Sequence, residues 1–204
     1  MHIDLNKLKP SHVYFQMIQT LVPRPIAWVL SENENTTYNL APFSYFSAVS
    51  SNPPLIMISI GKKPDGSNKD TRVNIEARNN FVIHIAHKEL MPLLNQSSET
   101  LPAEVSELDK LGLETTDFYG SHLPRIKQSR VAYACELYQV HELGNTPQAI
   151  IYGKVNTIYI DDAITSTDQK GQIKVHADKL DPIARLGANE YMEFGSIVQL
   201  IRPK

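Results

Sequence analysis

Residues 39–60 read NLAPFSYFSAVSSNPPLIMISI, and this stretch decides the fold. It holds two apolar runs, at residues 40–49 and 55–60, which are rich in strand-forming residues and are separated by the turn SSNPP. A third apolar run precedes them at residues 25–30, and the polar segment 31–35 that follows it predicts an antiparallel hairpin. The chain is therefore expected to open as a β-meander.

Pro42 interrupts the second apolar run. Proline has no N–H to donate to a sheet ladder, so residues 39–44 are expected to leave the ladder locally and to expose backbone amides and carbonyls. Unpaired backbone groups suit a flat heteroaromatic ring that carries several donors and acceptors. On the pattern alone, a bulge that only bends the strand is an equally good interpretation.

The remaining chain predicts further strands and a few helices. Largely alternating segments at residues 131–143 and 149–160, joined by a turn at 144–147, predict a second hairpin. Residues 81–86 and 196–202 predict two more strands, and residues 89–113 a partly helical excursion with a loop at 97–102. About six strands with two or three helices indicate a mostly β barrel decorated at its edges.

A short helix is predicted to begin at Asp70, with Asp70 as the capping residue and with Val73 and Ala77 on one face. Lys69 and Thr71 flank the cap, so a cation and a hydroxyl lie at a helix N-terminus, where unpaired amides favour a phosphate. An ordinary N-cap beside a solvated lysine explains the same residues without any ligand.

Composition limits the classes of function. The chain has 204 residues, of which 42% are hydrophobic, and this length predicts a single domain spanning residues 1–204. Its 20 Lys and Arg residues against 22 Asp and Glu do not favour nucleic acid or an anionic membrane as a partner. No apolar stretch resembles a secretory signal or approaches the roughly 20 residues of a membrane span, and Cys135 is the only cysteine. We therefore expect a cytoplasmic protein without disulfides.

The common enzyme motifs are absent from the sequence. There is no glycine-rich loop for a dinucleotide or a nucleoside triphosphate, no Gly-x-Ser-x-Gly and no His-Glu-x-x-His. The seven histidines lack metal-ligand spacing, so no metal site is predicted. His84 lies in an apolar run and is interpreted as a hydrogen-bonded core residue.

Four motifs in one order carry a family resemblance: RPIAWV at residues 24–29, NLAPFSYF at 39–46, VSSNPPLI at 49–56 and KDTRVNI at 69–75. Together they resemble the flavin reductase-like family of FMN-binding split β-barrels, in particular its flavoredoxin branch. The segment LDPIARLG at residues 180–187 and Tyr191 after it extend the resemblance over nearly the whole chain.

The resemblance implies a mostly β split barrel with a few peripheral helices, forming a homodimer that binds FMN near the subunit interface. The residues it implies at the cofactor are Arg24; Asn39, Leu40, Ala41, Pro42, Phe43 and Ser44 along the isoalloxazine and ribityl chain; Ser50, Ser51 and Asn52 beside the ribityl chain or phosphate; Lys69 and Thr71 at the phosphate; and Arg185 and Tyr191 at the partner subunit or the mouth of the site. For Arg24, an ion pair with Asp or Glu is an alternative interpretation.

The sequence departs from the family pattern at two positions. His84 stands where a smaller polar residue, often Asn, is usual, and Ala188 stands where a second glycine is common. Because alanine disfavours positive φ, the turn at Ala188 is expected to differ slightly.

The activity implied by the resemblance is NADH- or NADPH-dependent flavin reduction, in which FMN passes electrons to a second flavin, a partner oxygenase or another acceptor. No side chain is nominated as a catalytic residue, because the cofactor carries the bond-breaking step. Two alternatives stay open: an FMN-dependent oxidase that acts directly on a small substrate, and a flavin carrier without turnover. The sequence does not distinguish NADH from NADPH and does not identify the acceptor.

Overall fold

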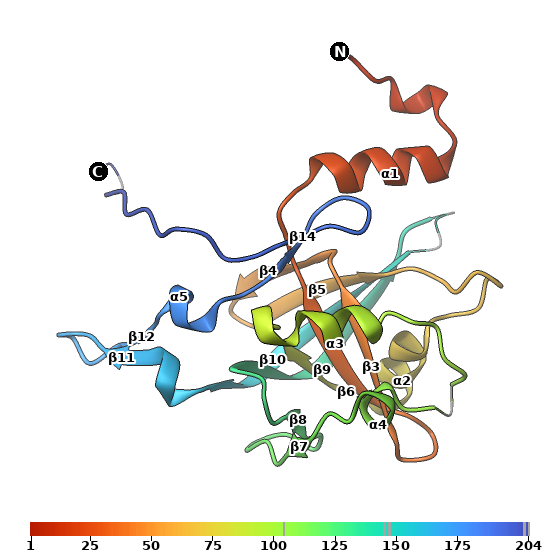
Figure 1. Ribbon diagram of the computed structural model, residues 1–204. Coiled ribbons are helices and arrows are strands. Elements are labelled where there is room, and N and C mark those ends of the chain that lie inside the picture. The colour runs from red at the N-terminus through yellow and green to blue at the C-terminus, as the bar shows by residue number, and fades with distance from the viewer. Residues whose placement is uncertain (104, 145, 147, 202, 204) are drawn as a thin grey trace.

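The structure is a computed structural model that describes every residue except Glu104, Asn145, Pro147, Arg202 and Lys204. Its centre is a seven-stranded antiparallel sheet with the strand order β3-β2-β6-β9-β10-β5-β4 (Figure 1). The strands are β2 (Ala27–Glu32), β3 (Tyr38–Phe43), β4 (Phe46–Ser51), β5 (Pro54–Ile60), β6 (Asn80–His84), β9 (Val131–Glu142) and β10 (Ala149–Ile160).

The two edge strands of this sheet, β3 and β4, are separated in sequence only by Ser44 and Tyr45. The sheet must therefore curl until its two edges meet. The Ser59 amide donates to the Tyr45 carbonyl at 2.8 Å, whereas no ladder joins β3 to β4 within the described part of the chain. This curled but unclosed sheet is the split β-barrel that the sequence predicts.

Short elements surround the sheet. The helices are α1 (Pro10–Thr20), α2 (Asp70–Arg78), α3 (Met91–Gln96), α4 (Glu107–Leu111) and α5 (Ala177–Leu180), with 3-10 turns at Leu5–Lys7, Lys88–Leu90 and Asp162–Ile164. The minor strands are β1 (Arg24–Pro25), β13 (Ala184–Arg185) and β14 (Tyr191–Met192) in one sheet, β7 (Thr115–Thr116) with β8 (Arg125–Ile126), and β11 (Thr165–Thr167) with β12 (Ile173–Val175). None of the described helices is both long enough and apolar enough to cross a membrane.

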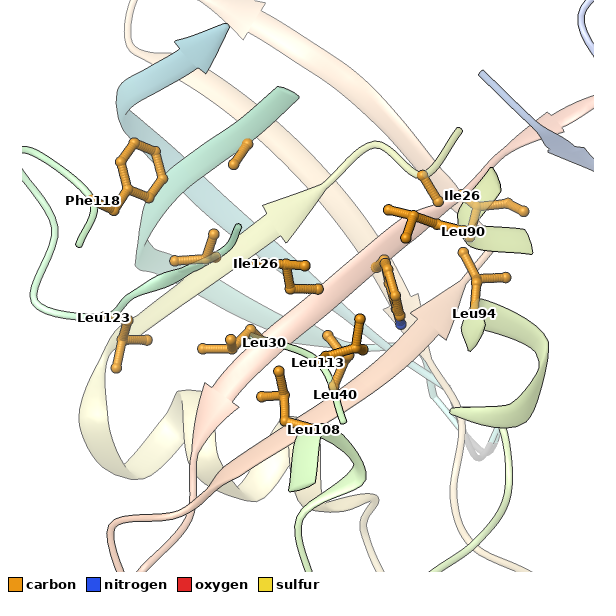
Figure 2. Close-up of a cluster of buried hydrophobic side chains, with 14 of the residues drawn as sticks. Ile26, Leu30, Leu40, Leu90, Leu94, Leu108, Leu113, Phe118, Leu123 and Ile126 are labelled. Carbon is orange, nitrogen blue, oxygen red and sulfur yellow. The ribbon is translucent and has the colours of Figure 1, made fainter. Parts of the chain in front are cut away.

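Strand β2 is buried on both faces, which explains its unbroken apolar run. Trp28 and Leu30 pack with Leu40 and Leu94 in a cluster that also receives side chains from α4 (Figure 2). Because side chains alternate along a strand, Val29 points the other way, into a second cluster with side chains from β5, β6, β9 and β10. The sheet therefore has an apolar core on each side.

Both predicted hairpins are confirmed, since β2 pairs with β3 and β9 pairs with β10. The strand predicted at residues 81–86 corresponds to β6. The turn predicted at 144–147 is only partly described, because two of its residues, Asn145 and Pro147, lie outside the described residues. The long run at 40–49 forms two strands instead of one, because the chain crosses between the sheet edges at Ser44 and Tyr45.

The strand predicted at 196–202 is wrong for residues 196–201, which are described and form no ladder. Ile197, Val198, Leu200 and Ile201 are between 55% and 98% exposed in this segment. Their residue types favour a strand, but a strand also needs a neighbour to receive its hydrogen bonds. Within the described chain no strand lies beside this tail.

The predicted cap of α2 is also wrong. Asp70 is the first residue of the helix, and Lys69 occupies the N-cap position without a side-chain cap. The Asp70 carboxylate forms an ion pair with Lys63 at 2.8 Å. The carboxylate is drawn away from its own helix because this cation lies within reach.

The predicted inner face of α2 must likewise be corrected. Val73 and Ala77 are exposed, whereas Thr71 and Asn74 are buried. The helix packs on polar side chains of β2 and the segment that follows it, and these side chains pair better with a hydroxyl and an amide than with apolar groups.

Ala188 adopts a φ of 48°, in the left-handed region that glycine prefers. The turn around it is closed by two hydrogen bonds of 3.0 Å, from Leu186 N–H to the Glu190 carbonyl and from Glu190 N–H to the Gly187 carbonyl. The expected avoidance of positive φ is therefore not found. An L-residue in this conformation costs about 1 kcal/mol, which the closed turn offsets.

Candidate functional site

Two adjoining cavities form one groove beside β3. Their volumes are about 540 and 390 Å³. Both are lined by Pro42, Lys62, Lys63, Pro64 and Lys69, so they are two parts of a continuous groove. Three lysines line both cavities, whereas the carboxylates of Asp70, Glu99 and Glu107 line only the smaller one. The larger cavity is therefore the part of the groove best suited to an anionic ligand.

Pro42 remains in the β2–β3 ladder, opposite Trp28, so its expected departure from the ladder is wrong. Two residues earlier, the Leu40 N–H points away from β2 and donates to the Glu107 carboxylate at 2.9 Å. Backbone groups alternate in direction along an antiparallel strand, so the backbone nitrogen of residue 42 also points away from β2. The ladder therefore requires no N–H at this position. Proline is tolerated because β3 is an edge strand, and it leaves carbonyl oxygens directed to the groove.

The start of α2 closes one end of the groove. The amides of Arg72 and Val73 both donate to the Lys69 carbonyl, whereas those of Asp70 and Thr71 have no partner among the described residues. These open amides and the helix dipole favour an anion. The structure therefore offers two backbone donors next to the groove lysines.

The Lys69 ammonium lies 5.5 Å from the centroid of the Phe43 ring. Within the described chain it forms no ion pair, in contrast to Lys63, which is paired with Asp70. Lys69 is exposed by surface area, but the protein atoms around its ammonium displace part of its hydration and so lower its pKa from the usual value. Lys69 is thus a positive charge held at an aromatic face and left without a carboxylate partner.

A buried polar cluster supports this end of the groove from behind. The Asn39 side-chain amide donates to Thr71 Oγ1 at 2.9 Å and to Ser31 Oγ at 3.2 Å. The Asn74 amide donates to the same serine at 3.2 Å and to Asn33 Oδ1 at 2.8 Å. These bonds connect β2 and β3 to α2 and hold the Thr71 hydroxyl in place beside the groove.

Glu107, at the start of α4, is a groove residue that the sequence did not reveal. It lines the smaller cavity and is 7% exposed. Burial raises the pKa of its carboxyl, and the hydrogen bond from Leu40 N–H opposes that rise. Its partner is 67 positions away in the chain, so no local pattern could have found this contact.

Arg24 lies behind the groove. Its guanidinium donates to the carbonyls of Ile18 and Leu21 at the end of α1 and to the Leu186 carbonyl, each at 2.7 Å. Its Nε donates to Ser44 Oγ at 3.3 Å. No carboxylate among the described residues pairs with Arg24, so the alternative of an ion pair is wrong. The residue connects α1 and the segment after β13 to the end of β3.

Arg185 and Tyr191 lie at a third cavity of about 160 Å³, which adjoins the groove at Pro42 and Ser44. The Arg185 guanidinium lies 4.4 Å from the centroid of the Tyr191 ring. The Tyr191 hydroxyl donates to the Asn95 side chain at 3.0 Å, which holds β14 against α3.

Ser50 and Ser51 end β4, Asn52 lies in the turn to β5, and all three are exposed. They line none of these three cavities, because β4 runs away from Ser44 along the opposite edge of the sheet. The predicted residues that do line the groove or the third cavity are Asn39, Ala41, Pro42, Phe43, Ser44, Lys69, Thr71, Arg185 and Tyr191. The Leu40 side chain is in the core, and only its backbone faces the groove.

The interpretation of His84 as a core residue is confirmed. Its Nδ1 lies 3.1 Å from the Trp28 carbonyl, and its Nε2 accepts from Ile126 N–H at 2.9 Å, so the proton must be on Nδ1. Burial lowers the pKa of His84 to about 4. No cluster of three His, Cys, Asp or Glu side chains suited to a metal ion occurs among the residues described.

A family model described as a flavin reductase-like domain matches residues 19–175. The chain belongs to the flavin reductase-like family. The match includes every groove residue except Tyr14, and the family resemblance found in the sequence is confirmed. An uncharacterised protein of Halalkalibacterium halodurans is 33% identical to this family member over 100% of the chain and 97% of its own length.

Solved structures agree with this assignment. Nitrilotriacetate monooxygenase component B from Bacillus cereus is 28% identical, with a TM-score of 0.89 over 98% of each chain. The 2-nitrobenzoate 2-nitroreductase NbaA of Pseudomonas fluorescens is 26% identical, with a TM-score of 0.88 over 100% of this chain and 96% of its own. A flavoredoxin of Desulfovibrio vulgaris, at 17% identity and a TM-score of 0.73 over 89% of this chain and 93% of its own, shares the fold.

Proposed function

We propose that this flavin reductase-like protein binds FMN in the groove beside β3 and uses it to pass electrons from NADH or NADPH to an acceptor. The observation that carries the proposal is that two kinds of chemistry meet in the groove. Three lysines line both of its cavities, with the open amides of α2 beside Lys69, and the edge strand β3 forms a wall with outward carbonyls. A phosphate suits the lysines and amides, and a flat ring with donors suits the strand edge.

The residues present fit this cofactor. A phosphate at the start of α2 would meet the unpaired Lys69 ammonium and the amides of Asp70 and Thr71. Thr71 Oγ1 accepts from Asn39 and keeps its own hydrogen for one further bond. The groove volumes of about 540 and 390 Å³ are those of ordinary cofactor sites.

We propose the predicted residues as the FMN site, with roles that follow their positions. Lys69 and Thr71 would hold the phosphate, residues 39–44 would line the ring and ribityl chain, and Arg24 would position Ser44 from behind. Arg185 and Tyr191 would border the mouth. Ser50, Ser51 and Asn52 lie outside the groove of their own chain, and their contact with FMN stays a prediction.

FMN, when bound, supplies hydride acceptance and onward electron transfer. The protein's own part is to bind, orient and exclude water. Pro42 and Phe43 would keep water from one side of the groove, and Lys69 would fix the phosphate end so that the ring lies along β3. No proton transfer by a side chain is required, so no catalytic residue is proposed.

A homodimer belongs to this proposal. Helix α1 buries none of its residues and exposes Tyr14 and Phe15, and the C-terminal segment exposes Val198 and Leu200. Apolar surface of this kind is unusual on a monomer and favours an interface. Sedimentation of the full chain at micromolar concentration should give the mass of two copies, and a monomer would contradict the dimer.

The proposal extends to the electron acceptor, the cellular location and the domain organisation. The 28% identity to a monooxygenase component supports an oxygenase partner as the acceptor of the electrons. We propose a cytoplasmic location, because the single cysteine is free, as expected in a reducing compartment. We also propose one domain spanning residues 1–204, because the length suits a single core.

The test starts with the purified full chain. We expect it to bind FMN in equimolar amount, and the absorbance of the bound flavin to bleach when NADH or NADPH is added without oxygen. Absence of FMN binding would contradict the whole proposal. Binding without bleaching would leave a flavin carrier, and oxygen consumption with a small substrate but no nicotinamide would indicate a direct oxidase.

A further inference from the structure

The third cavity is a separate compartment next to the groove. It has a volume of about 160 Å³ and shares Pro42 and Ser44 with the larger part of the groove and Pro42 and Ser98 with the smaller part. A ligand in this compartment would therefore be divided from the groove only by Pro42 and two hydroxyl side chains. Its other walls come from Ile26 between β1 and β2, and from α3, β13 and β14.

The size and walls of the compartment suit one planar ring. Ile26 and Leu94 are 4% and 0% exposed and supply an apolar wall together with Pro42. The Tyr191 ring stands at the same compartment. A cavity of about 150 Å³ with apolar walls is large enough for benzene, whereas a dinucleotide needs several times that volume.

The charge of the compartment is positive and uncompensated. Arg185 lines it, and its one hydrogen bond in the described chain is to the Ala188 carbonyl, so most of its five N–H donors remain available. Arg24 lies directly opposite Arg185 in the β1–β13 pair. No carboxylate lines the compartment, and neither arginine forms an ion pair with a described residue.

Hydrogen-bond donors converge on the same place. The Ser44 hydroxyl oxygen accepts from Arg24 Nε at 3.3 Å, so its own hydrogen can be donated into the compartment. A guanidinium matches the two oxygens of a carboxylate, and the Arg185 plane is already oriented by Tyr191. A neutral ring would leave these donors without an acceptor.

We propose that this compartment binds a single-ring aromatic carboxylate, with the carboxylate at Arg185 and the ring between Pro42 and Tyr191. The proposal deepens the proposed function, because it names the class of small molecule that would lie beside the groove. The binding itself depends on residues of the compartment alone, and it is tested without FMN.

Calorimetric titration of the FMN-free full chain with benzoate and with benzamide provides the test. The two probes have nearly the same shape and differ in charge. We expect benzoate to bind at least about tenfold more tightly than benzamide, the usual minimum for a charge-assisted bidentate contact. Equal affinities, or no benzoate binding at millimolar concentration, would overturn the proposal.

Variants locate the site. Arg185→Gln should lower benzoate affinity about tenfold or more. Arg125→Gln is the matched control, because Arg125 also stacks on a tyrosine, 3.4 Å from the Tyr159 ring, and lines none of the three cavities. Equal losses in both variants would overturn the proposal. A loss in Lys69→Ala alone would also overturn it, because benzoate would then bind at the lysines of the groove.

The two proposals can fail independently. A chain that binds benzoate as described but does not bind FMN would contradict the proposed function and leave the carboxylate site standing. A chain that binds and reduces FMN but shows no preference for benzoate would contradict only the carboxylate site.

Discussion

Titratable groups whose pKa is shifted by desolvation occur in two regions of this protein, the barrel core and the groove, and the regions differ in whether the hydrogen-bonding atoms of those groups are already bonded within the fold. In the core, His84 has both ring nitrogens bonded to backbone groups, and the ring is fully buried. In the groove, Lys69 has no ion-pair partner in the described chain, and Glu107 faces a cavity. A shifted pKa therefore marks burial in both regions, and only unused hydrogen-bonding capacity beside a cavity indicates a site.

The largest expected effect would test the core side of this comparison. The pKa of His84 is about 4 in the fold against 6.5 in a model peptide, so between these values the unfolded chain binds more protons. The contribution of His84 is complete above pH 6.5, and the free energy of unfolding should fall by about 3 kcal/mol as the pH drops to 4. Urea unfolding at a series of pH values measures this change.

Two variants separate His84 from other groups in this pH range. His84→Gln should lose this part of the pH dependence. His87→Gln measures the second contribution of this kind, because burial also lowers the pKa of His87, and it should leave the part of the slope that comes from His84 in place. If His84→Gln kept the full slope of the natural protein, the assignment of the slope to the core would be wrong.

The next effect would test the groove side. Lys69→Ala should weaken FMN binding by about 1.5–3 kcal/mol, the usual value of a hydrogen bond to a charged group. Fluorescence titration measures the affinity. Lys127→Ala is the control, because Lys127 is exposed and paired with Glu114 away from the groove. An unchanged affinity in Lys69→Ala would remove Lys69 from the phosphate site.

Glu107 provides a sharper comparison, since its carboxylate is both hydrogen-bonded within the fold and part of the lining of the groove. Glu107→Ala would leave the Leu40 N–H without its acceptor and should lower the free energy of unfolding by about 1–2 kcal/mol. Glu107→Gln keeps an oxygen acceptor and removes the buried charge, so its stability at neutral pH should be close to that of the natural protein. Equal losses in the two variants, measured by urea unfolding, would show that the hydrogen bond to β3 is not the stabilising contact.

The smallest expected effect concerns the β4–β5 turn. Ser51→Ala should change FMN affinity by less than about 0.5 kcal/mol, because Ser51 is exposed and outside the cavities. A larger loss in the same fluorescence titration would place this turn at the cofactor, as the family motif implies, and would show that a single chain does not contain the complete site.

Much of the fold was predictable because the signals are local. The hairpins follow from apolar runs separated by turn residues, and the predicted helix after Lys69 is present as α2. The errors arose where a local preference met a distant partner. Asp70 pairs with Lys63 and does not cap α2. The inner face of α2 carries Thr71 and Asn74, which bond to a polar cluster, and not Val73.

The site was predictable in part for the same reason. Pro42 and Lys69 stand out in the sequence, and both line the groove. Glu107 and Lys62 do not stand out, because nothing near them in the chain indicates a cavity. The motif at 50–52 is as distinctive as the others, yet its residues lie on the opposite edge strand, outside the groove.

The sequence by itself determined the family through four motifs in one order. It also determined both hairpins and the lysine beside a helix start, because side-chain periodicity, turn chemistry and helix termini depend on neighbours within a few residues. Only the tertiary structure decided that Leu40 N–H donates to Glu107 and that Arg24 donates to backbone carbonyls. It also decided that Arg185 lines a small cavity. These contacts join residues far apart in the chain. They exist because α4 packs on β3 and β13 pairs with β1, and no local pattern encodes where two distant segments come together.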